Sequence, residues 1–133
     1  MRSMTRAAAL VALLLLGAAL AVSPATASSG TTYYASLQGT THYPTAYGNS
    51  NYYGGMGMMG SRDVKVTVKQ AQRLAGQYVM VYLNGTRVGR MLVSSTGYAH
   101  HEWTGQYVPY CMRGSGVVVK TSRGTSVVVG SYR

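Results

Sequence analysis

The chain contains 133 residues, with 12 Lys or Arg, only 2 Asp or Glu and a formal net charge of +10 at pH 7. A chain of this length holds one small domain, and the scarcity of acids leaves little material for acid–base catalysis. The single cysteine excludes an internal disulfide, so strand packing must supply the stability.

Residues 1–27 have the pattern of a secretory signal peptide. Two arginines precede an apolar run from Ala7 to Val22, and small residues at positions 25–27 suit cleavage after Ala27. The apolar run is shorter than the ~20 residues that a membrane-spanning helix needs. The sequence therefore predicts a secreted, extracellular protein whose mature chain, 28–133, has no transmembrane segment and a formal charge of 10 − 2 = +8.

Residues 28–61 are predicted to form a flexible tail. Up to residue 60 they include no charged side chain but six tyrosines, set among Gly, Ser, Thr and Asn. Low hydrophobicity and many glycines do not offset the entropy of ordering. We therefore expect a tail that holds a domain, residues 62–133, away from the surface.

The domain begins with alternating residues and continues into a hairpin. Val64, Val66 and Val68 alternate with polar residues, which predicts a strand with one buried face. Residues 71–76 form a short connection with room for one helical turn. From residue 77 to 93, two alternating runs flank Asn84-Gly85, a pair that suits a two-residue type I′ turn.

The hairpin requires a β-bulge. Counting back from the turn sets Val79 opposite Arg90, an awkward partner for a core valine. A glycine inside a strand commonly marks a bulge, so Gly89 predicts one extra residue there. The bulge moves Met91 and Val93 onto the buried face with Val79.

The remaining chain predicts further short strands. Residues 98–103 form one, with Ala99, His101 and Trp103 on one face and Tyr98, His100 and Glu102 on the other. Residues 106–112 contain a proline and predict an edge strand or an irregular crossing. Residues 116–122 and 125–132 form a second hairpin. Six or seven short antiparallel strands without a helix predict an all-β sandwich or small barrel.

The stretch 79–99 resembles the hairpin of bacterial immunoglobulin-like modules of exported proteins, and also that of transthyretin-like sandwiches. The matching residues are Val79, Val81, Asn84, Gly85, Val88, Gly89 and Gly97. The resemblance implies a small immunoglobulin-like β-sandwich that binds or acts as a spacer at the cell wall or outside the cell. It implies no catalytic residues, and the chain departs from the pattern after Trp103.

An aromatic and basic surface is the leading candidate site. Its residues are Tyr78, Tyr82, Arg87, Arg90 and Tyr98. Together with the +8 charge, they predict binding of an anionic cell-wall polymer or a glycan, without a cofactor. The alternative is that these tyrosines are simply the outer face of a sheet. There is no run of Lys or Arg, and we expect no specific nucleic-acid partner.

Copper handling by a secreted protein is the alternative function. Thioether and imidazole groups favour copper, and the candidate ligands are Met56, Met58, Met59, His42 and His100. A cationic effector or inhibitor is a third interpretation.

Cys111 is expected to be buried between Tyr110 and Met112, and a dimer linked through this cysteine is not favoured. No orienting motif surrounds the thiol, and Asp63 and Glu102 lie far apart in the sequence, so we expect no enzyme. The leading interpretation is a non-catalytic binding or structural module.

Overall fold

The computed structural model describes residues 30–54 and 60–133. These residues form eight strands and one short 3₁₀ helix, η1. The elements are β1 (Thr31–Gly39), β2 (Tyr47–Gly54), β3 (Arg62–Lys69), η1 (Gln72–Leu74), β4 (Tyr78–Leu83), β5 (Thr86–Leu92), β6 (Ala99–Gly105), β7 (Gly116–Thr121) and β8 (Ser126–Ser131). Within the described residues, no helix is long and apolar enough to cross a membrane.

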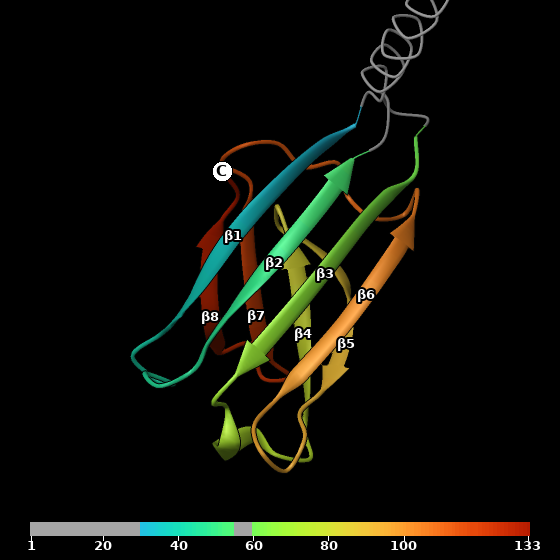
Figure 1. The fold of residues 1–133 in the computed structure, drawn as a ribbon. Coiled ribbons are helices and arrows are strands. Elements are labelled where there is room, and N and C mark those ends of the chain that lie inside the picture. The colour runs from blue at the N-terminus through green and yellow to red at the C-terminus, as the bar shows by residue number, and fades with distance from the viewer. Residues whose placement is uncertain (1–29, 55–59) are drawn as a thin grey trace, which may run out of the picture.

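The strands make one antiparallel sheet in the order β5-β4-β7-β8-β1-β2-β3-β6. Figure 1 shows its two halves facing each other, with β1, β2, β3 and β6 in front of β8, β7, β4 and β5. Only two register pairs, Gln38 with Val129 and Gly39 with Val128, join β1 to β8, so the sheet folds over at this point. The predicted all-β antiparallel fold is confirmed, as a nearly closed, barrel-like sheet that is compatible with a sandwich. It has eight strands instead of six or seven.

The flexible tail predicted over residues 28–61 is wrong for residues 31–54. These residues form β1 and β2, which pair with each other over eight positions, and β2 pairs with β3 over eight more. The sheet therefore begins at Thr31, and not at the predicted domain boundary at residue 62. The predicted signal peptide, residues 1–27, and residues 28, 29 and 55–59 lie outside the described residues.

Buried tyrosines explain why this polar stretch forms strands. Tyr52 is 1% exposed, and its ring centroid lies 6.2 Å from that of Tyr33 and 5.6 Å from that of Tyr132. The hydroxyls of Ser50 and Tyr132 are hydrogen-bonded at 2.7 Å, so the buried polar atoms are satisfied. A tyrosine buries about 150–250 Å². A few inward-facing rings therefore supply the apolar surface that Gly, Ser and Asn lack.

Several local predictions in the second half of the chain are confirmed. The three alternating valines of β3 are buried, η1 lies in the short connection before β4, and β7 and β8 form a hairpin. Asn84 and Gly85 have φ angles of 51° and 85°, as a type I′ turn requires.

The predicted bulge is present, one residue before the glycine that indicated it. Val79 pairs with Met91 and Val81 pairs with Gly89, so Val88 is the extra residue of β5. Val88 is half-buried and packs against the core. The bulge thus keeps Arg90 away from Val79, as expected.

Gly89 has a second role, at the seam between β5 and β6. These two strands end the sheet order and share no ladder. A Cβ atom built on Gly89 would overlap the indole of Trp103, which comes from β6. The missing side chain therefore lets the indole lie directly on the β5 backbone and close the sheet. His101, on the same face of β6, is exposed, with its ring centroid 4.7 Å from that of Trp103.

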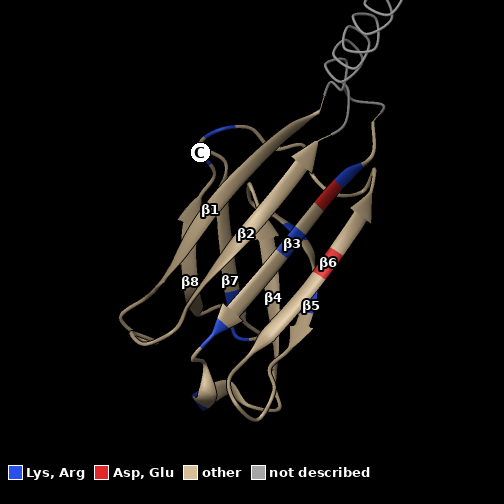
Figure 2. Cartoon of the chain, viewed as in Figure 1, with Lys and Arg blue, Asp and Glu red and all other residues tan. Residues whose placement is uncertain are grey.

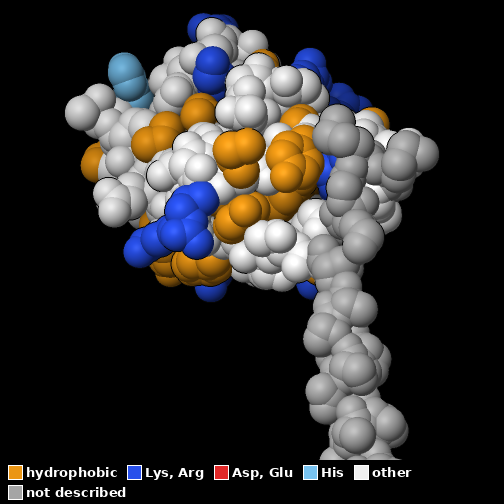
Figure 3. Space-filling view, turned by 90° about the horizontal axis from the view of Figure 1, so that it is seen from above, with side chains coloured by type: hydrophobic (Ala, Val, Ile, Leu, Met, Phe, Trp, Pro, Cys, Tyr) orange, Lys and Arg blue, Asp and Glu red, His pale blue; other side chains and the backbone are white. Residues whose placement is uncertain are grey.

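Residues 106–115 cross from β6 to β7 as an irregular segment, which confirms one of the two predicted alternatives. Arg62 holds the crossing, because its guanidinium donates to the Val108 carbonyl at 2.6 Å and to the Gln106 carbonyl at 2.7 Å. The Cys111 N–H donates to the Tyr52 hydroxyl at 3.0 Å. Figure 3 shows this end of the molecule, where exposed hydrophobic side chains gather beside Lys and Arg.

Replacement of Gly89 by alanine should destabilise the protein. The added methyl group must displace the Trp103 indole, and overpacking of this kind costs about 1–3 kcal/mol. Urea unfolding followed by tryptophan fluorescence would measure the change. Gly116→Ala is the matched control, because a Cβ there would meet only the Gly130 carbonyl oxygen, at 4.0 Å. Equal stabilities of the two variants would contradict the proposed closure.

Candidate functional site

The outer face of β4 carries three large side chains. Alternation along the strand buries Val79, Val81 and Leu83 and turns Tyr78, Met80 and Tyr82 outward. Tyr78 is 42% exposed, whereas Met80 and Tyr82 are half-buried by their neighbours.

Neighbouring strands place basic residues on both sides of β4. Met80 pairs with Arg90 of β5 and with Lys120 of β7, so one row across the sheet reads Arg90, Met80, Lys120. Tyr82 pairs with Arg87 of β5 in the next row. Paired strands lie ~4.8 Å apart, which sets the backbones at Arg90 and Lys120 roughly 10 Å from each other.

Two cation–π contacts join these residues diagonally. The Arg90 guanidinium carbon lies 4.0 Å from the centroid of the Tyr78 ring, and the Lys120 ammonium nitrogen lies 4.9 Å from that of Tyr82. Exposed contacts of this kind contribute about 0.5–1 kcal/mol each. They hold two cations and two rings in a fixed arrangement, which reduces the entropy lost when a ligand binds.

The surface formed by Tyr78, Met80, Tyr82, Arg87, Arg90 and Lys120 is called the tyrosine–basic face below. Both acidic residues of the chain, Asp63 and Glu102, lie on β3 and β6, in the other half of the sheet (Figure 2). The tyrosine–basic face therefore carries three cations and no carboxylate, and its potential is positive.

Four of the five predicted binding residues share this face, and the fifth does not. Tyr98 precedes β6, and its ring stacks on that of His100 at a centroid distance of 6.4 Å. It therefore belongs to the outer side of the β3–β6 pair. Lys120 was missed by the sequence prediction, because only the pairing of β7 with β4 brings it beside Tyr82.

The copper ligands are not assembled within the described residues. His42 lies in the connection between β1 and β2, whereas His100 lies on β6 with its Nδ1 2.8 Å from the Thr67 hydroxyl. In residues 30–54 and 60–133, no group of three His, Cys, Asp or Glu side chains could hold a metal ion. Met56, Met58 and Met59 lie outside the described residues, so copper binding stays a prediction.

The two carboxylates lie closer together than their sequence positions indicated. Asp63 pairs with Thr104 and Lys65 pairs with Glu102, so the acids stand in neighbouring rows of the outer face of β3 and β6. Asp63 accepts a hydrogen bond from the Thr104 hydroxyl at 2.9 Å. Lys65 lies directly opposite Glu102 and two positions along β3 from Asp63.

Cys111 is buried, as the sequence predicts. Burial raises the pKa of its thiol from 9.0 to about 11, although a hydrogen bond with Ser115 and the charge of Arg62 act in the opposite direction. A thiol with this pKa is protonated at neutral pH and is therefore a poor nucleophile.

Comparisons of the chain with protein-family models, curated proteins and solved structures found no significant match. The all-β antiparallel fold thus rests on the structure itself. The resemblance of the hairpin to immunoglobulin-like modules gains no support from a relative.

The Cys111 thiol should react slowly in the folded protein. At pH 8 a rise of the pKa from 9.0 to about 11 reduces the thiolate about 100-fold, and burial limits access further. Reaction with an aromatic disulfide reagent, with and without 8 M urea, would measure the ratio. The control is the double variant Cys111→Ser, Met112→Cys, because Met112 is 55% exposed. A native Cys111 that reacts as fast as the control thiol would contradict the burial.

The same shift links stability to pH. The pKa of Cys111 is raised in the folded state, so the protonated thiol contributes to the free energy of unfolding. This contribution is complete below pH 9 and is lost as the pH rises toward 11. The free energy of unfolding should therefore decrease above about pH 9, and less so in Cys111→Ser.

Proposed function

We propose that the mature protein is a small secreted, non-catalytic module that binds an anionic polymer or glycan at the cell surface. The observation that carries this proposal is the pair of cation–π contacts on the tyrosine–basic face, Arg90 on Tyr78 and Lys120 on Tyr82. Arginine and lysine attract polyanions, and tyrosine rings offer flat surfaces against which sugar rings can pack.

The charge distribution favours a long ligand over a single ion. The cations of the tyrosine–basic face come from two strands on opposite sides of β4, and no acid lies in that half of the sheet. A linear polyanion can contact both sides at once, and each contact adds to the affinity. Such binding weakens with salt, since exposed charges are screened beyond about 10 Å at 0.1 M ionic strength.

The location and family within this proposal rest on the sequence. Residues 1–27 have the pattern of an exported protein. An immunoglobulin-like module is the finer fold assignment that we propose, on the basis of the Asn84-Gly85 turn and the antiparallel all-β sheet. The absence of catalysis is proposed because Cys111 is buried and both acids lie on an outer sheet face.

The protein should sediment with purified bacterial cell walls at low salt and dissociate as salt is added. Each cation near an anionic surface contributes on the order of 1 kcal/mol, so the double variant Arg90→Gln, Lys120→Gln should bind at least about tenfold more weakly. Co-sedimentation across a salt series would measure both effects.

The matched control is Lys65→Gln, Lys69→Gln, which removes the same charge from the outer face of β3. It should retain most of the binding. Equal losses in the two double variants would mean that net charge alone is responsible. A wild-type protein that stays in the supernatant at low salt would overturn the proposed wall binding.

A further inference from the structure

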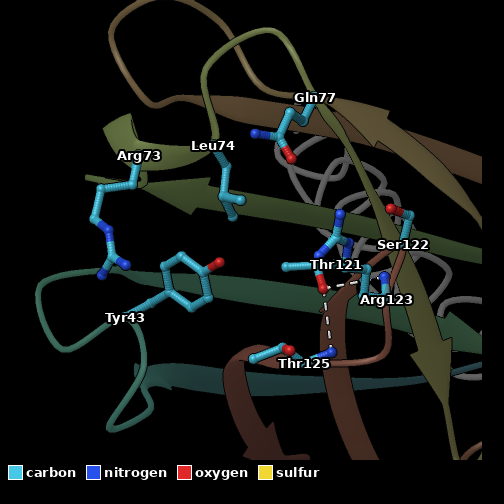
Figure 4. Close-up of a pocket in the computed structure, with 8 residues that line it drawn as sticks. All are labelled: Tyr43, Arg73, Leu74, Gln77, Thr121, Ser122, Arg123 and Thr125. Atoms are coloured by element: carbon cyan, nitrogen blue, oxygen red, sulfur yellow. Dashed lines mark hydrogen bonds between the residues drawn. The ribbon is translucent and has the colours of Figure 1, made fainter.

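A cavity of about 410 Å³ lies at the end of the sheet opposite the 106–115 crossing. Three connections line it: the loop between β1 and β2, the segment around η1 and the turn between β7 and β8. The lining residues are Tyr43, Arg73, Leu74, Gln77, Thr121, Ser122, Arg123 and Thr125 (Figure 4). Small-molecule sites usually have volumes of about 300–1,000 Å³, so the cavity is large enough for one.

Backbone hydrogen bonds hold the connections in place before any ligand arrives. In the β7–β8 turn, the Thr121 N–H donates to the Thr125 carbonyl at 2.8 Å and the Gly124 N–H donates to the Thr121 carbonyl at 2.9 Å. After η1, the Gln77 N–H donates to the Leu74 carbonyl at 2.9 Å. A site built from fixed turns loses little entropy on binding.

The hydroxyl of Thr121 is oriented to donate. Its Oγ1 accepts hydrogen bonds from the backbone N–H groups of Arg123 and Thr125, at 3.3 and 3.1 Å. These two bonds occupy both lone pairs of the hydroxyl oxygen, so the hydroxyl can contribute only its proton to a further hydrogen bond. Figure 4 shows the Tyr43 hydroxyl directed toward Thr121 and Arg123, with the Gln77 side chain above them.

The two arginines of the pocket have different roles. Arg73 lies with its guanidinium carbon 5.0 Å from the Tyr43 ring centroid and donates to the His42 carbonyl at 2.8 Å, so it forms part of the wall. Arg123 supplies N–H donors and no acceptor. No Asp or Glu lines the pocket, which therefore favours an anion.

The pocket lies at the end of the two strands, β4 and β7, that contribute to the tyrosine–basic face. Gln77 directly precedes Tyr78, and Thr121 directly follows Lys120. Thr121 pairs with the buried Val79 and has the inward parity of that residue, whereas Lys120 faces outward, so the two sites lie on different sides of the strand ends. The Tyr43 ring, which is half-buried, provides non-polar surface for the C–H groups of a sugar ring, and the hydroxyls and the amide can bind its hydroxyls.

We propose that this pocket binds one acidic sugar unit, a hydroxylated ring that carries a carboxylate or a phosphate group. Arg123 binds the anionic group, and Gln77, Thr121 and the Tyr43 ring recognise the sugar. This inference deepens the proposed function and rests on it for the source of the sugar. The pocket supplies the specificity that the tyrosine–basic face lacks.

Titration of the ¹⁵N-labelled full mature protein with monosaccharides tests the pocket. The probes are galacturonate, galactose 6-phosphate and neutral galactose. At least one acidic sugar should shift the amide signals of Thr121, Arg123 and Gln77 and bind at least about tenfold more tightly than galactose, because a charged partner of Arg123 is worth more than 1 kcal/mol. The preferred acidic probe distinguishes a carboxylate from a phosphate source.

Arg123→Gln should weaken binding of the acidic sugar about tenfold while the other amide signals keep their positions. The matched control is Arg113→Gln, which removes the same charge at the opposite end of the sheet and should leave the affinity unchanged. Equal losses in the two variants, or no preference over galactose, would overturn the pocket assignment. Cell-wall sedimentation that persists in those cases would leave the proposed function intact, so the two failures are distinguishable.

Discussion

The sheet closes between β5 and β6 by side-chain packing and without a ladder, and the rest of the fold depends on this contact. Trp103 reaches across from β6 to the backbone of Gly89, and the bulge at Val88 brings that glycine into place. A bulge bends its strand and increases its twist, so β5 can turn toward β6. The closure keeps the two halves of the sheet over one core, in which the inward-facing valines of β3, β4 and β7 are buried.

The upper end of this core is held by polar contacts in place of disulfides. The hydroxyl of Tyr52 accepts the Cys111 N–H, and the hydroxyls of Ser50 and Tyr132 bond to each other. These bonds join β2 to the 106–115 crossing and to the end of the chain. A small domain often needs additional cross-links for stability, and here a tyrosine cluster joins these segments. It also makes the N-terminal hairpin an integral part of the sheet.

The lower end of the sheet and the outer face of β4 carry the two candidate sites. Lys120 and Thr121 are consecutive residues, yet the first faces outward beside Tyr82 and the second lines the pocket. Both acids of the chain lie on β3 and β6, so neither neutralises the cations of these two sites. In our proposal the cations of the outer face attract a polyanion, and the pocket has a size suited to one sugar unit. We assign these two roles to neighbouring parts of the same protein.

Local patterns in the sequence determined the second half of the sheet, because strand alternation and turn chemistry depend only on nearby residues. The Asn84-Gly85 turn, the bulge that keeps Arg90 off Val79 and the burial of Cys111 could all be predicted in this way. Only the tertiary structure decided the fate of residues 31–54. These residues form strands because Tyr33 and Tyr52 pack on Tyr132, which lies about 80–100 residues later in the chain. The same holds for the candidate sites: pairing of β7 with β4 brings Lys120 to Tyr82, and three connections distant in sequence enclose the pocket. Such contacts leave no local period in the sequence, because they depend on which strands become neighbours.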